Sequence, residues 1–210
     1  MSLTKHLFQS MLRKALEKIE TNLDYLNQLD SATGDGDHGT AIKTAMQVAC
    51  KAAQGCEGSW VDLFSAVGWE VMGGTSGSTS AITGAFYTGM GNALGGHAEE
   101  NLDADTFIAM FESALANVRT VSRAQVGDKT IMDAMIPAVA TMSALKGKGS
   151  SHAEVMQAGA DAATIGAAST KDLTARFGRA KNLGERSRGH LDAGASSLAI
   201  IFQAFAETLR

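Results

Sequence analysis

The chain has 210 residues, 45% of them apolar, and a formal net charge of −4 at pH 7, which fits one globular domain spanning residues 1–210. The acidic balance disfavours nucleic acid as the main partner, no apolar run is long enough to span a membrane, and the N-terminus lacks a secretory pattern. Cys50 and Cys56 have no partners at zinc spacing, which is typical of free thiols in a reducing cytosol. We therefore expect a cytoplasmic protein.

The apolar pattern predicts helices along the whole chain. A long first helix ending near residue 30 is indicated by an apolar stripe at helical spacing, formed by Leu12, Leu16, Ile19, Leu23 and Leu26. Further helices are predicted at 37–53, 59–73, 77–93, 103–121, 130–146 and 150–175, and a last one carries the stripe Leu198, Ile201, Phe202, Phe205 and Leu209. Pro137 is expected to kink its helix or to mark its true start. Eight helices with mostly short loops predict an all-α domain whose sequential neighbours pack antiparallel.

Three carboxylates stand close together in the loop that follows the first helix. Asp30, Asp35 and Asp37 lie in the segment DSATGDGDHG at 30–39, and close carboxylates repel one another, so a positive group is expected there. A solvated acidic turn is one interpretation, because Asp and Gly are ordinary turn residues. We favour Mg²⁺ held for a phosphate ligand, since this ion prefers oxygen ligands and three carboxylates suit two ions.

Two other ligand sites fit this loop poorly. Gly34, Gly36 and Gly39 match the dinucleotide pattern G-x-G-x-x-G, but an amphipathic helix precedes them where that pattern requires a strand. A calcium loop counted from Asp35 would place Gly39 and Met46 at positions that need oxygen ligands.

Three further segments could complete a phosphate site. MGGTSGSTSA at 72–81 favours a phosphate cradle at a helix start or, equally, an N-cap with a tight helix crossing. The long irregular stretch 176–194 carries arginines, which suit phosphate, although a mutually paired surface cluster is as good an interpretation. VGDKT at 126–130 is typical of a turn and N-cap before a helix whose methionines form core or an apolar wall for adenine.

In this order, these segments resemble the L subunit of bacterial dihydroxyacetone kinase and the nucleotide-binding domain of single-chain dihydroxyacetone kinases. The matching segments are GDGDHG at 34–39, GGTSG at 73–77, GDKT at 127–130 and GRAKNLGERSRGHLDAGA at 178–195. The resemblance covers nearly the whole chain. It implies a barrel of eight antiparallel up-and-down helices that binds ADP or ATP through two Mg²⁺ at one end.

The resemblance also implies roles for individual residues. The metal ligands would be Asp30, Asp35 and Asp37, and Arg179 would approach the nucleotide and support phosphoryl transfer with them. Further nucleotide contacts would come from His38, Gly39, Thr40, Ala41, Thr75, Ser76, Ser122, Ile131, Asp192, Ala193 and Gly194. The family usually has proline where this chain has Ala193, which leaves that contact less rigid.

By the same resemblance, the chain would pass a phosphoryl group to a ketose held on a separate K subunit, so it should not phosphorylate a sugar alone. In one version, which we slightly favour, ADP stays bound and a phosphohistidine protein of the phosphotransferase system rephosphorylates it. In the other version, exchangeable ATP is the phosphoryl donor. A nucleotide sensor that binds a transcription regulator is an alternative from another class. A metal-dependent phosphatase is disfavoured, because these motifs lack an obvious nucleophile or general base. Which ketose is used is not encoded here.

Overall fold

The computed structural model describes residues 2–74, 77–95 and 101–210. In these ranges the chain forms helices and one isolated antiparallel bridge, Leu3–Leu102. The α-helices are α1 (Lys5–Thr21), α2 (Leu23–Ser31), α3 (His38–Gly55), α4 (Trp60–Gly74), α5 (Gly77–Asn92), α6 (Ala104–Val121), α7 (Met132–Ser143), α8 (His152–Ser169) and α9 (Ala193–Leu209), and the 3-10 helices are η1 (Thr170–Asp172) and η2 (Arg179–Ser187). None of the described helices is both long and apolar enough to cross a membrane.

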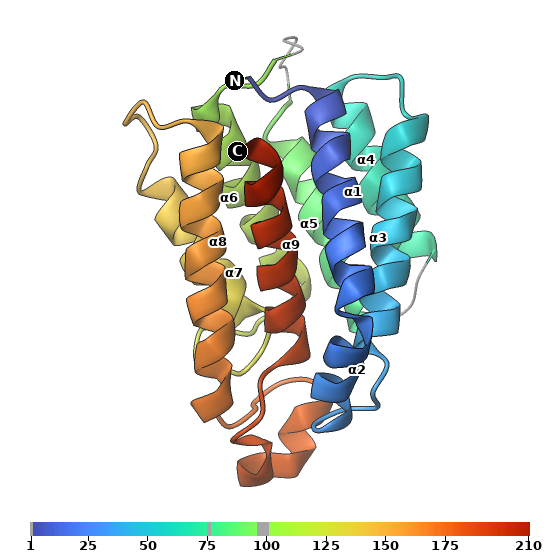
Figure 1. Ribbon diagram of the computed structural model, residues 1–210, viewed down its shortest axis with the longest axis vertical. Coiled ribbons are helices and arrows are strands. Elements are labelled where there is room, and N and C mark those ends of the chain that lie inside the picture. The colour runs from blue at the N-terminus through green and yellow to red at the C-terminus, as the bar shows by residue number, and fades with distance from the viewer. Residues whose placement is uncertain (1, 75–76, 96–100) are drawn as a thin grey trace.

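The helices stand side by side and close into a barrel (Figure 1). Packing runs from α1 to α3, then from each helix to the next up to α9, and α9 packs back against α1. With α1 and α2 counted as one rod, this confirms the predicted all-α barrel of about eight up-and-down helices.

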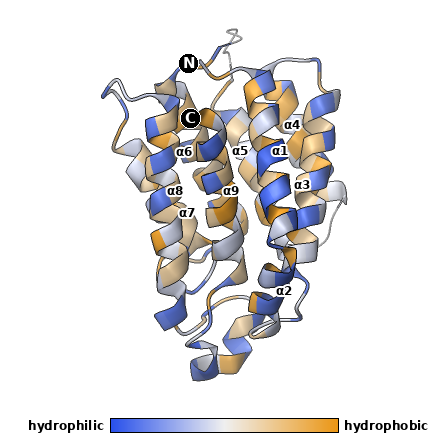
Figure 2. Cartoon of the chain, in the orientation of Figure 1, coloured by the Kyte–Doolittle hydropathy of each residue, from blue (hydrophilic) through white to orange (hydrophobic). Residues whose placement is uncertain are grey.

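Aromatic side chains fill the centre of the barrel. Phe8 and Phe64 meet edge to face with ring centroids 4.9 Å apart, and Phe111 and Phe202 do so at 5.5 Å. All four are fully buried, and each such side chain contributes roughly 1.5–3 kcal/mol to stability. Figure 2 shows hydrophilic and hydrophobic residues alternating along the helices, as expected for helices with one buried face.

Two helices differ most from the prediction. The long first helix breaks at Asn22, whose side-chain amide donates to the Lys18 carbonyl oxygen (2.8 Å) and so competes with the helical backbone. The predicted helix 150–175 ends at Ser169. There the Thr170 hydroxyl donates to the Ala167 carbonyl (2.6 Å) and accepts the N–H of Asp192 (2.9 Å). The helix thus ends where a distant part of the chain binds it.

Pro137 lies inside α7 and does not mark its start. Proline has no N–H, so the Asp133 carbonyl one turn earlier loses its usual helical donor. Gly166 of α8 packs against this point, where an added Cβ would lie 2.1 Å from the Asp133 carbonyl oxygen. The missing side chain therefore lets α7 and α8 approach closely.

The alternation of helix direction brings every second connection to the same end of the barrel. The connections that follow α2, α6 and α8, and the facing ends of α4 and α5, lie at the end opposite the two termini (Figure 1). Helices α3, α5, α7 and α9 all begin there. The topology thereby gathers the described parts of the four sequence segments singled out above, although they are far apart in the chain.

Candidate functional site

A cavity of about 1020 Å³ opens at this end of the barrel. The first turns of α3, α5, α7 and α9, or the residues just before them, line it. Helix N-termini carry free N–H groups and a partial positive charge, so they favour anions. The cavity is therefore suited to a ligand that carries phosphate.

The three predicted metal ligands come together at the edge of this cavity. Asp30, Asp35 and Asp37 each offer a carboxylate oxygen, and these oxygens lie within 4.8 Å of one another. Asp30 is half-buried and the other two are exposed. Hard divalent cations such as Mg²⁺ bind carboxylate oxygens in clusters of this kind, so the residues present fit the ion that the sequence predicted.

The loop that carries the carboxylates folds around Asp30. One oxygen of Asp30 accepts the N–H groups of Gly36 (2.8 Å) and Asp37 (3.1 Å). Gly36 has a φ of +80°, and a Cβ at Gly34 would lie 2.4 Å from an Asp30 oxygen, so both positions favour glycine. Asp37 precedes α3 without a side-chain capping bond, which leaves its carboxylate available to a ligand.

The cation expected near these charges is Arg179. Its guanidinium forms an ion pair with Asp35 across the mouth of the cavity. The two side chains are 69% and 45% exposed, so the pair lies in water and contributes little to stability. The contact does show that the long loop brings an arginine to the carboxylate cluster.

Two polar side chains lie deeper in the site. His38 pairs through Nε2 with the Ser197 hydroxyl (2.9 Å), and burial lowers its pKa while Asp30 and Asp37 partly offset this effect. Asp192 accepts the N–H of Ala195 (2.7 Å) as the N-cap of α9. Burial raises the pKa of Asp192 to about 6, so a proton or a cation is favoured close to it.

The sequence pattern of GDKT predicts a turn and N-cap, but it does not reveal the roles of Lys129 within the motif and Asp133 just after it. Asp133, in the first turn of α7, accepts the N–H groups of Gly127 (2.6 Å) and Thr130 (2.7 Å) and so shapes the loop from inside the helix. Lys129 is buried at the cavity and donates to two backbone carbonyls. For Lys129 the motif itself was the only signal, because its two carbonyl partners lie 41 and 61 residues away in the sequence.

The structure places most predicted nucleotide contacts on the cavity wall, namely His38, Thr40, Ala41, Ser122, Ile131, Arg179, Asp192, Ala193 and Gly194. Gly39 is buried against α2, where a Cβ would lie 2.3 Å from the Leu23 carbonyl oxygen. Thr75 and Ser76 lie outside the described residues. The methionines of α7, Met132, Met135 and Met142, are core, and apolar lining comes from residues such as Ile82 and Phe177.

The fold and the site define a helical barrel with an acidic, phosphate-suited cavity at one end. The model of the DAK2 domain matches residues 32–207, and the chain belongs to this family.

Named relatives agree with this assignment. The chain is 33% identical to a PEP-dependent dihydroxyacetone kinase ADP-binding subunit, DhaL, of Listeria innocua, covering 91% of this chain and 89% of the relative. It is also 33% identical to the ADP-binding subunit DhaL of the PTS-dependent dihydroxyacetone kinase of Lactococcus lactis, covering 94% of each.

A solved structure shares the fold. The dihydroxyacetone kinase from C. freundii, crystallised in complex with AMP-PNP and Mg²⁺, matches 99% of this chain with a TM-score of 0.73 and 25% identity. The present chain spans about a third of that protein, 34% of its length. The matched region is therefore one part of a longer kinase.

Proposed function

We propose that the chain is the nucleotide-binding subunit of a kinase for dihydroxyacetone or a related short ketose, and that a separate K subunit holds the ketose. The observation that carries this proposal is the convergence of Asp30, Asp35 and Asp37 beside a cavity lined by four helix starts. The two DhaL relatives, which match nearly the full length of this chain and are named as ADP-binding subunits, support it.

The proposed ligand is Mg-ADP or Mg-ATP with two Mg²⁺, which supply positive charge to the phosphate oxygens when bound. Asp30, Asp35 and Asp37 would hold the ions, with Asp30 oriented by the loop N–H groups. Arg179 would leave Asp35 and donate to phosphate, because the carboxylate then has a metal partner. Phosphoryl transfer needs little more from a protein than position and charge neutralisation.

We further propose that ADP stays bound as a cofactor and is rephosphorylated in place by a phosphohistidine protein. The PEP-dependent and PTS-dependent names of the relatives support this version over exchangeable ATP. A cytoplasmic location fits the same proposal, since Cys50 and Cys56 are free thiols.

The test is a reconstitution. The purified chain with dihydroxyacetone and ATP should give no turnover, because the ketose site lies on the K subunit. Adding the K subunit and a phosphohistidine donor should produce turnover of dihydroxyacetone. In a separate measurement, the purified chain should release about one ADP per chain when denatured. Robust turnover by the chain alone would refute the division of labour, and restored turnover with ATP alone would favour the exchangeable version.

A further inference from the structure

The connection between α8 and α9, residues 170–192, closes on itself at its base. The N–H of Gly189 donates to the Lys171 carbonyl oxygen (2.7 Å), and the N–H of Asp192 donates to the Thr170 hydroxyl (2.9 Å). Loops with ends this close behave as compact units. What holds the base therefore contributes to the position of the loop, together with the N–H that Arg176 donates to the Asp128 carbonyl oxygen (3.1 Å).

Lys129, from the α6–α7 connection, reaches into this base. Its Nζ donates to the carbonyl oxygen of Thr170 (2.5 Å) at one end of the loop and to that of His190 at the other. The residue is only 2% exposed, and a buried ammonium is unfavourable unless its protons are bonded. The two carbonyls accept two of its three protons and join both ends of the loop to one side chain.

The backbone of Lys129 is held in an uncommon conformation. Its φ is +60°, and it is the one non-glycine residue with positive φ in the described ranges. Such a conformation persists only where the surrounding structure enforces it, and it is frequent at functional sites. The bonds of the ammonium, together with the adjacent N–H that Thr130 donates to Asp133 (2.7 Å), supply that constraint.

We propose that Lys129 is a positioning residue: its ammonium fastens the base of loop 170–192 to the start of α7 and thereby sets where Arg179 and the first turn of α9 lie. Arg179 pairs with Asp35 from this loop, and Asp192 is both the end of the loop and the N-cap of α9. The consequence for nucleotide binding rests on the proposed function, whereas the consequence for the loop does not.

Hydrogen exchange tests the loop directly, without nucleotide. Lys129→Met keeps an unbranched side chain one atom shorter than lysine and removes the donors. Amide exchange within 170–192 should become at least about 10-fold faster while the other helices keep their protection. Lys129→Gly, which tolerates the positive φ, should show the same local effect and guards against a folding defect. Lys148→Met, at an exposed lysine, is the matched control and should change nothing.

Unchanged loop exchange in both folded variants would overturn the proposal. So would an equal increase along the whole chain, since that is the result expected if Lys129 only stabilises the fold.

A second measurement asks whether Lys129 acts through Arg179. Arg179→Met should weaken Mg-ADP binding about 10-fold in the wild-type background but less than about 2-fold when Lys129 is already Met, because the arginine is then misplaced. Equal effects in both backgrounds would overturn the action through Arg179. If the wild-type chain does not bind Mg-ADP, the proposed function fails, and the exchange result still decides whether Lys129 positions the loop.

Discussion

Each of the three clustered carboxylates has different partners. Asp30 accepts N–H groups of its own loop, Asp35 pairs with Arg179, and Asp37 precedes α3 without a capping bond. Asp30 therefore shapes the loop as well as contributing charge, while Asp35 and Asp37 contribute mainly charge. Substitutions at Asp30 should disturb the loop most, because two N–H groups depend on its carboxylate.

Asp192 gives a pH-dependent prediction at the same scale. Its pKa rises from 3.8 to about 6 on folding, so the folded chain binds more protons than the unfolded chain between these values. Stability without ligand should then fall as pH rises through this window. Asp192→Asn keeps a capping acceptor but has no charge to bury, and should be more stable at pH 7 by on the order of 1–2 kcal/mol.

Urea unfolding between pH 4 and pH 8 checks this prediction. The advantage of Asp192→Asn should shrink toward pH 4, where the carboxyl of the folded chain is protonated and that of the unfolded chain, with a pKa of 3.8, is close to half protonated. A difference in stability that does not vary with pH would contradict the account.

Among the elements, local pattern predicted most helices, whereas the end of α8 depends on a remote contact and the break at Asn22 on a local side-chain bond. Apolar spacing placed α3 to α6 within two residues of their observed bounds. The end of α8 depends on Asp192, which is 22 residues from Thr170, so no local pattern could predict it. The break at Asn22 has only a weak local signal, a side chain able to bond its own backbone.

The close contact of α7 with α8 predicts a sharp cost for adding one methyl group. Gly166→Ala would place a Cβ against the backbone of Asp133 and Ala134, at 2.1 and 2.9 Å from their nearest atoms, so the helices must separate. We expect a loss of about 1–3 kcal/mol in the free energy of unfolding.

Gly55→Ala, at the end of α3, is the matched control. A Cβ there meets no described atom within 4 Å, so this variant should be neutral or slightly more stable. Equal melting temperatures for the two variants would contradict the packing argument.

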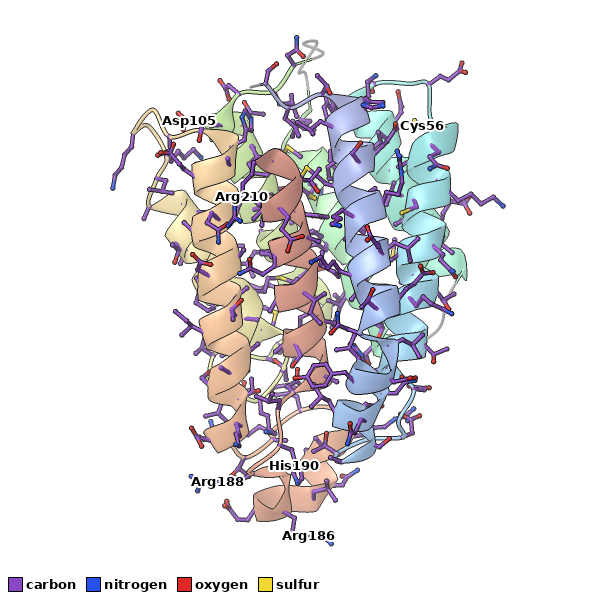
Figure 3. All side chains as sticks on the ribbon, in the orientation of Figure 1. Cys56, Asp105, Arg186, Arg188, His190 and Arg210 are labelled. Atoms are coloured by element: carbon purple, nitrogen blue, oxygen red, sulfur yellow. The ribbon has the colours of Figure 1, made fainter. Side chains whose placement is uncertain are left out.

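Across the whole molecule, topology converts scattered motifs into one site. Arg186, Arg188 and His190 of the long loop lie at the end of the barrel opposite Cys56, Asp105 and Arg210 (Figure 3). The sequence predicted which segments take part, because each carries charge or glycines that a phosphate site needs. It could not predict that Lys129 joins two of them, because that link depends on backbone carbonyls 41 and 61 residues away.

The most direct test of the central claim is calorimetric titration of the nucleotide-stripped chain with ADP and Mg²⁺. We predict one ADP bound per chain, lost on adding EDTA and weakened roughly 100-fold by Asp30→Asn, Asp35→Asn or Asp37→Asn. Asp24→Asn, an exposed acid outside the cluster, should bind like the wild type, and circular dichroism should show unchanged helix content in all variants. Binding that is absent in the wild type, or equally tight with EDTA and in all three cluster variants, would contradict a metal-dependent nucleotide site.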